Sequence, residues 1–306
     1  MSSQSVNSVK IIWRIALHEL LIAFKTRRIL GVLFLYSTVS VMGSYAYVAI
    51  LKAMEEQSTQ FLINSGVDAS KAGQAVSVMG GETYQKVLAL FAGAQPEQLS
   101  NAIMSSPFIP VILLASFAFL PTLILLLAYD IVVAEVETRT ICYSLLRATR
   151  AQLFLGKLFS QSIILLLLNT LMLVLLLVMS LNMIGSTSAS QTVLGIFRVW
   201  LCLIPYGLCY LAMILFASSM SNKRRGTLTL SIIILSTFQV FSWLRHLPEE
   251  GFWGVIKMLH WLSPSQYADG LWLSGLSAPL TSAGILLTFT VGFSILSILR
   301  LKGRDL

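Results

Sequence analysis

The sequence contains few charged residues for its length. Only 11% of the 306 residues are Asp, Glu, Lys or Arg, whereas 56% are hydrophobic and the mean hydropathy is +0.82. A soluble globular domain keeps about 25% of its residues charged. The composition therefore excludes an ordinary soluble domain and indicates a protein that lies in a membrane.

Cysteine is scarce as well, and none of the three cysteines has the CxxC spacing of redox or zinc sites. Cys202 and Cys209 fall in a hydrophobic stretch that is long enough to cross a membrane. We expect these two thiols and Cys142 to be buried, without a metal or redox function.

A phosphate-binding loop of the GxxxxGK[ST] kind is also missing. Gly156-Lys157 is followed by leucine and lacks the earlier glycine. We therefore expect no ATP site, and no other cofactor or metal, on this chain.

What the sequence does contain is a series of long apolar stretches. A membrane-spanning helix needs about 20 mostly apolar residues. Six stretches qualify, and they predict an all-α membrane protein with six transmembrane helices. They are residues 29–51, 109–133, 158–184, 193–219, 227–244 and 279–300.

The placement of the basic residues predicts the orientation. If the N-terminus is cytoplasmic, 15 of the 21 Lys and Arg residues lie inside and 6 lie outside. The positive-inside rule then places both termini in the cytoplasm. The net charge of +8 is explained by this topology, so it needs no nucleic-acid partner.

Three segments outside the spans have distinct patterns. Residues 1–28 include "VKIIWRIALHELLIAF", whose apolar spacing predicts an amphipathic helix lying on membrane lipid. Within the six-span domain, 29–306, we interpret 52–108 as an external helical loop between spans one and two. Residues 245–278 predict a re-entrant helical pair between spans five and six, which enters the membrane without crossing it.

The loop between spans two and three carries a compact run of charges. Read as a helix over 138–150, it places one set of residues on one face and a more apolar set on another. The first set is Arg139, Tyr143, Arg147 and Arg150, and the second is Ile141, Cys142, Leu145 and Thr149. Periodicity alone favours an ordinary loop helix that obeys the positive-inside rule.

The order of residues around this loop resembles the signature of ABC-2 type permeases, the transmembrane subunits of ABC exporters with a type V-like fold. The residues that carry the resemblance are Asp130, Glu135, Thr140, Leu145-Leu146, Arg150 and Gly156-Lys157. "HELLIAFKTRRIL", "SPSQYADGLW" and the ending "LKGRDL" are similar to further parts of that family. Arg139 stands where the family usually has glycine before the threonine.

The resemblance implies a permease subunit of an ATP-driven exporter in a bacterial cytoplasmic (inner) membrane. The loop would be the coupling helix that docks on a separate ATP-binding subunit, which would bind ATP and Mg. A second permease copy, or a paralogue, would complete the transporter, and this chain alone would not be an enzyme. The implied coupling residues are Glu135, Glu137, Arg139, Thr140, Tyr143, Arg147 and Arg150.

Polar residues within the first and fifth spans are candidates for a substrate pathway. Small hydroxyl residues in spans also commonly pack helices together, and that reading is favoured on the residues alone. The resemblance implies that spans one, two and five border a central cavity. The candidates are Ser40, Ser44, Tyr47, Thr237 and Gln239. The absence of fixed charge in the spans favours an apolar or amphipathic substrate.

Two other functions are alternatives to transport. A membrane-embedded enzyme, such as an intramembrane protease, needs His and carboxylates grouped at helical spacing. His18, His246 and His260 instead fall in predicted interfacial or loop segments on opposite sides of the membrane. A non-transporting membrane assembly protein is the second alternative, and co-purification of an ATP-binding protein would separate it from a transporter.

Overall fold

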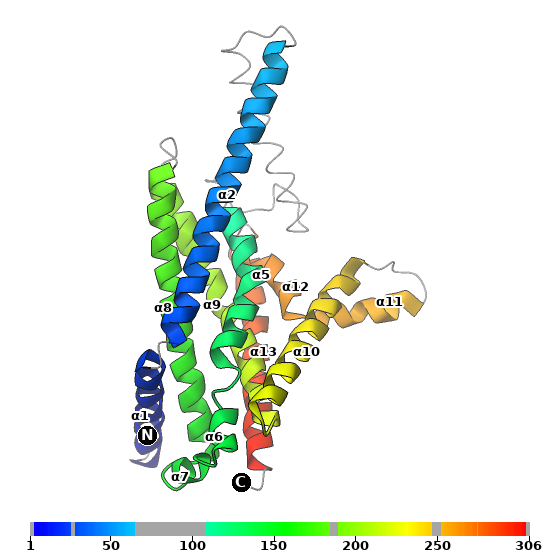
Figure 1. Cartoon of the computed structure of the whole chain (residues 1–306). Helices are drawn as coiled ribbons and strands as arrows, with labels where there is room; N and C mark the ends of the chain where they lie inside the picture. The colour runs from blue at the N-terminus through cyan, green and yellow to red at the C-terminus, as the bar shows by residue number, and fades with distance from the viewer. Residues whose placement is uncertain are drawn as a thin grey trace.

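A computed structural model describes residues 3–25, 28–64, 108–183, 189–246, 252–273 and 275–303, and every regular element in these ranges is helical. The longer helices form an elongated bundle, with the N-terminus and the C-terminus near the same end (Figure 1). In chain order they are α1 (Ser3–Lys25), α2 (Arg28–Asn64), α5 (Phe108–Ala128), α6 (Val133–Glu137), α7 (Ile141–Leu145), α8 (Arg150–Met183), α9 (Ala189–Met220), α10 (Arg224–Trp243), α11 (Phe252–Lys257), α12 (Pro264–Leu271) and α13 (Ser277–Lys302). Two short 3-10 helices, η2 (Leu244–His246) and η3 (Met258–Leu262), flank α11.

Five segments in the described ranges are long and apolar enough to cross a membrane. They match the second to sixth predicted spans and, for the described residues, confirm the helical fold of an integral membrane protein. They are Ser116–Glu137, Arg150–Leu175, Val193–Met220, Arg224–Trp243 and Ser277–Lys302.

The first predicted span, 29–51, lies in α2 and is helical, but the apolar part that the structure describes there, Ile29–Gly43, is shorter than the other five. The helix continues to Asn64, so it runs beyond the expected start of the external loop at residue 52. Figure 1 shows α2 projecting past the ends of its neighbours. The remainder of that loop, residues 65–107, lies outside the described residues.

Helix α9 lies at the centre of the bundle, where it packs against α5, α8, α10 and α13. Its residues Leu211, Met213 and Leu215 are completely buried. Gly207 brings α9 close to α8, because a Cβ there would lie 2.8 Å from a methyl group of Leu165. The core is therefore built around residues 202–219 of α9, none of which is exposed, and the other spans cover this part.

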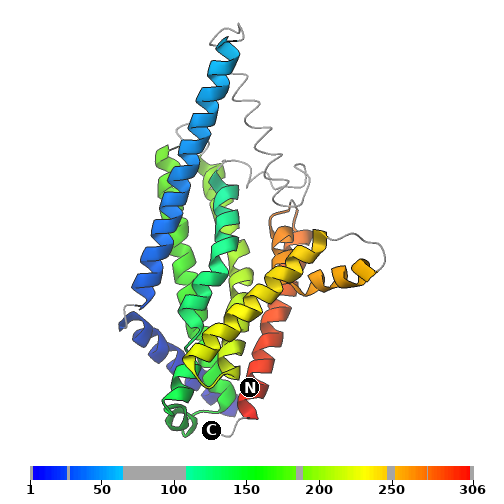
Figure 2. The ribbon, with the colours of Figure 1, turned by 45° about the vertical axis from the view of Figure 1, so that its right-hand side comes forward.

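Short elements occupy the segment between the last two spans, and none of them is long enough to cross a membrane. Helix α10 leans away from the bundle, with α11 beyond its upper end (Figure 2). Arg245, just after α10, donates a hydrogen bond of 2.5 Å to the Asp269 carboxylate on α12. Helix α12 packs tightly on α13, since a Cβ at Gly270 would clash with Ser282. The ion pair therefore ties the end of α10 to a fixed neighbour.

Candidate functional site

The charged loop does not form the continuous helix predicted over 138–150. Helix α6 ends at Glu137 and α7 covers only Ile141–Leu145, with a turn between them. In this turn Arg139 has a φ of 56°, in the left-handed region that interrupts a right-handed helix. The prediction of one helix was wrong because a local backbone reversal at Arg139 divides the segment in two.

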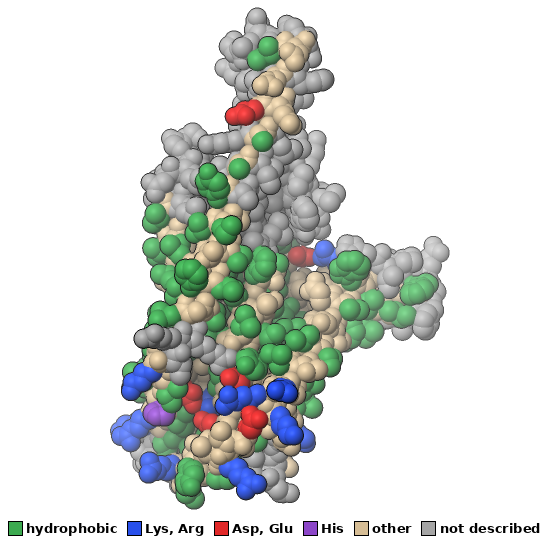
Figure 3. Space-filling view, viewed as in Figure 1, with side chains coloured by type: hydrophobic (Ala, Val, Ile, Leu, Met, Phe, Trp, Pro, Cys, Tyr) green, Lys and Arg blue, Asp and Glu red, His purple; other side chains and the backbone are tan. Residues whose placement is uncertain are grey.

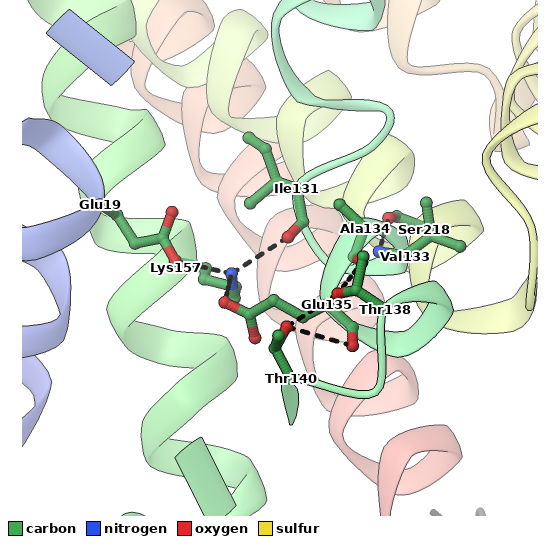
Figure 4. Close-up of polar contacts among 9 residues, drawn as sticks. All are labelled: Glu19, Ile131, Val133, Ala134, Glu135, Thr138, Thr140, Lys157 and Ser218. Carbon is green, nitrogen blue, oxygen red and sulfur yellow. Dashed lines mark hydrogen bonds and ion pairs between the residues drawn. The ribbon is translucent and has the colours of Figure 1, made fainter. Parts of the chain in front are cut away.

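Hydroxyl groups hold this turn in place. The Thr138 hydroxyl lies 2.8 Å from the Ala134 carbonyl oxygen, to which it donates, and 2.9 Å from the Thr140 hydroxyl. The Val133 backbone N–H, at the start of α6, donates to Ser218 Oγ on α9 over 3.1 Å. Figure 4 shows these contacts around the turn. The loop is therefore anchored to the central helix of the bundle.

Lys157, on α8, is the centre of a buried ionic cluster and is only 1% exposed. Its Nζ lies 2.7 Å from Glu19 Oε1 on α1 and 2.7 Å from Glu135 Oε1 on α6. It also donates to the Ile131 carbonyl oxygen over 3.0 Å. An ammonium group has three donors, and these contacts use all of them (Figure 4). We call Lys157, Glu19 and Glu135 the Lys157 cluster.

The residue before Lys157 explains how α1 comes close enough to join the cluster. A Cβ built at Gly156 would lie 2.7 Å from Ile15 Cγ2 and 3.2 Å from the Ile12 carbonyl oxygen. Any larger residue would push α1 away from α8. The Gly156-Lys157 pair, which the sequence suggested as a motif, thus supplies both the space for α1 and the charge that binds it.

Two more charged residues of the loop region have partners within the chain. Arg150 Nη1 donates to the carbonyl oxygens of Leu301 and Lys302, at 2.5 and 2.8 Å, and so joins the start of α8 to the end of α13. Glu137 forms an exposed ion pair with Arg224, at 3.3 Å between Oε2 and Nε. Arg150 and Glu137 thus link the loop region to α13 and α10.

The remaining residues of the loop form an exposed surface, which we call the α7 tip: Arg139, Tyr143, Leu146 and Arg147. Tyr143 is 75% exposed and Leu146 is 83% exposed, whereas Ile141 is buried beneath them. Basic side chains gather at this end of the bundle (Figure 3). Large apolar side chains next to arginines are typical of protein interaction surfaces.

Cys142 is exposed, so its predicted burial was wrong, whereas Cys202 and Cys209 are buried as predicted.

The predicted pathway residues belong to two helices, α2 and α10. Ser40, Ser44 and Tyr47 belong to α2, but their side chains lie outside the described part of the structure. Thr237 and Gln239 are exposed on α10. The Thr237 hydroxyl donates to the Ile233 carbonyl oxygen of its own helix over 2.8 Å.

Sequence reasoning missed the role of Glu19 and the buried position of Lys157. A signal existed in each case: Glu19 is the only acidic residue in α1, and Lys157 directly precedes the apolar stretch predicted as span three. Within the described ranges, no group of three or more His, Cys, Asp and Glu residues is placed to hold a metal ion.

Comparison with known protein families identifies a family for this chain. A family model described as ABC-2 family transporter protein matches residues 13–306, nearly the whole chain. The match begins within α1 and includes the Lys157 cluster and the α7 tip. No curated protein matches the chain.

Proposed function

We propose, because this chain belongs to the ABC-2 family of transporter proteins, that it is the permease subunit of an ATP-driven exporter. The chain itself is a membrane subunit and not a catalyst. A separate subunit would bind ATP and Mg and hydrolyse the nucleotide. The α7 tip would be the surface on which that subunit docks, and this end of the bundle and both termini would then lie in the cytoplasm of a bacterial cell.

The observation that carries this proposal is the contrast between the α7 tip and its base. Tyr143, Leu146 and Arg147 are exposed, while the segment just before them is fixed to α9 by Ser218 and to α8 by Lys157. A subunit that changes shape on ATP hydrolysis needs a firmly attached surface to push. An apolar and cationic tip can bury its apolar groups against the partner and bond acidic groups with its arginines.

The ionic contacts beneath the α7 tip join it to several helices. A movement of the tip would therefore be passed to the membrane spans. The Lys157 cluster joins α6 to α8 and α1, and Glu137 is paired with Arg224 at the start of α10. A displacement of the turn would therefore act on four helices together. Arg150 would position α13 rather than contact the partner, because its guanidinium already binds carbonyl oxygens of that helix.

The exposure of helix α10 supports the proposal that a second permease copy is a further partner. It is apolar enough to cross a membrane, yet little of it is buried in the single chain. Its exposed residues include polar ones, Thr229, Ser236 and Gln239, and polar groups in a span normally face protein or a water-filled cavity. We infer that this face meets a second copy and borders the cavity through which an apolar or amphipathic substrate leaves.

The experiment is to co-express the chain with the ATP-binding subunit from its gene neighbourhood and to measure co-purification and ATP hydrolysis. Reversing charge and removing apolar contact at the tip, with Arg147→Glu together with Tyr143→Ala, should abolish co-purification. The control is Arg225→Glu, which changes another exposed arginine, outside the tip, and should leave the complex intact. If the tip variant still co-purifies fully and supports normal ATP hydrolysis, the docking assignment is wrong.

A further inference from the structure

Helix α1 presents three different faces. The inward face packs on α8, with Ala16 buried and Ile15 against Gly156. It also carries Glu19 to Lys157. The other two faces are exposed, and each repeats at helical spacing.

The second face is an exposed apolar stripe. Trp13 is 53% exposed and Leu21 52%, although both are large hydrophobic side chains. The stripe consists of Val9, Trp13, Leu17, Leu21 and Phe24. Trp13 also contacts the ring of Phe159 on α8, with ring centroids 5.8 Å apart. Aromatic side chains of this kind gather where a membrane meets water, which places the stripe against lipid.

The third face, displaced from the stripe by one residue, is cationic. Lys10, Arg14 and Lys25 supply its charge and are exposed. His18 and the apolar Ile22 lie between Arg14 and Lys25 on the same face and are also exposed. Since Glu19 points inward to Lys157, the exposed face has no acidic residue among the described part of α1. An apolar stripe bordered by such cations is the pattern of a helix that lies in the headgroup region of an anionic membrane.

We propose that the exposed faces of α1 bind anionic phospholipid headgroups of the adjoining leaflet, and that Glu19 transmits this binding through Lys157 to the α7 tip. The occupant is a lipid rather than a protein because the cations border a continuous apolar stripe. A soluble acidic partner would leave that stripe exposed to water. The importance of the tip rests on the proposed function, but the lipid contact and its transmission do not.

The physical link is direct. Lys157 Nζ contacts Glu19 and Glu135 at the same distance, 2.7 Å, so the two carboxylates share one cation. Lipid that holds α1 against α8 keeps the Glu19 carboxylate in contact with Lys157. Lys157 then keeps its position and its contact with Glu135. When α1 moves away, Lys157 loses one of its two counter-charges and the turn above Glu135 loosens. Glu19 and Lys157 are therefore positioning residues for the tip.

The lipid contact is tested with the full chain in nanodiscs of phosphatidylcholine alone or of an equimolar mixture with phosphatidylglycerol. A polarity-sensitive fluorophore is attached at Leu17→Cys in a Cys142→Ser background, because Cys202 and Cys209 are buried. Emission should shift to shorter wavelength in the anionic nanodiscs. The shift should be lost when Lys10, Arg14 and Lys25 are changed to Gln, and it should weaken at high salt because salt screens exposed charges.

The transmission is tested by amide hydrogen exchange over Val133–Leu145 in the same nanodiscs. Anionic lipid should slow exchange there severalfold in the native chain. Glu19→Gln should abolish the difference between the two lipids, whereas Arg224→Gln, which removes an exposed pair near the same turn, should retain it.

Several outcomes overturn the proposal. Equal emission in both lipids would refute the lipid contact, as would an emission shift seen only after an ATP-binding subunit is added, which would assign the cationic face to protein. A lipid response of the tip that persists in Glu19→Gln would refute the transmission. The comparison of the two lipids is made without an ATP-binding subunit, so failure of the docking experiment above would leave it unaffected.

Discussion

The Lys157 ammonium and the Glu19 carboxylate lie 2.7 Å apart, although 138 positions separate them in the chain. The contact joins the first helix of the chain to the base of the α7 tip, because the same ammonium also binds Glu135. Taking three charged groups out of water is costly, and mutual attraction offsets that cost only when each has a partner. The cluster is therefore sensitive to the loss of its cation.

Replacing Lys157 by Met should destabilise the protein strongly. Two carboxylates would remain close together beneath the loop without a counter-charge, and breaking a buried pair in this way costs about 3–5 kcal/mol. The measurement is the unfolding of purified protein in detergent. Arg224→Met is the control, because its pair with Glu137 is exposed and should contribute no more than about 1 kcal/mol. Equal losses in the two variants would contradict the structural role of the cluster.

The close approach of α1 to α8 at Gly156 predicts that alanine is tolerated there less well than at Gly284, an open position on α13. Gly156→Ala should destabilise the protein by about 1–3 kcal/mol, because the new methyl group would meet Ile15 and the Ile12 backbone. Gly284→Ala should be neutral or stabilising by up to about 1 kcal/mol, since alanine favours helix and nothing lies within 4 Å of that position. Unfolding in detergent compares the two. A stabilised Gly156→Ala variant would show that α1 does not pack as closely as described.

The sequence predicted the spans well because their signal is local. A run of apolar residues of sufficient length identifies α5, α8, α9, α10 and α13 without knowledge of their neighbours. The family resemblance also identified Glu135 as a coupling residue, which stays a prediction, whereas its contact with Lys157 was not anticipated. Periodicity failed at 138–150, because a single left-handed residue ends a helix and changes little in the hydrophobic pattern.

The Lys157 cluster could not be predicted in the same way. Its contacts depend on three helices that meet only in the folded bundle, and no local pattern pairs Glu19 with Lys157. The glycine at 156 identifies a close approach but not the helix that approaches. The contact of Arg150 was not predicted for a related reason. A cation on a loop helix suggests an external partner, whereas the structure places this guanidinium against carbonyl oxygens at the end of α13.

The left-handed turn predicts a stabilising substitution. Arg139 has a φ of 56°, where residues with a Cβ lose roughly 1–2 kcal/mol and glycine does not. Arg139→Gly should therefore stabilise the folded protein by about 1 kcal/mol, less the added chain entropy of unfolded glycine. Thermal unfolding in detergent measures the gain. Arg147→Gly, at an exposed position without a positive φ, should give none, and a destabilised Arg139→Gly would show that the side chain makes a contact that outweighs the strain.

The Arg245–Asp269 pair predicts a pH dependence of stability. Burial raises the pKa of Asp269 from 3.8 to about 6, although the neighbouring Arg245 guanidinium lowers it. Between about pH 4 and pH 6 the folded state therefore binds a proton that the unfolded state releases. Stability is greatest below this window and falls as the pH rises through it, by at most about 3 kcal/mol for a shift of this size.

Comparing the native chain with Asp269→Asn isolates this effect from other titrating groups. The difference between their unfolding free energies should change by up to about 3 kcal/mol between pH 4 and pH 7, with the native chain losing stability relative to the variant. Arg245→Gln should move the inflection to higher pH, because Arg245 opposes the effect of burial. A difference that is constant across this range, or one that grows in favour of the native chain, would mean that the arginine outweighs burial at this carboxylate.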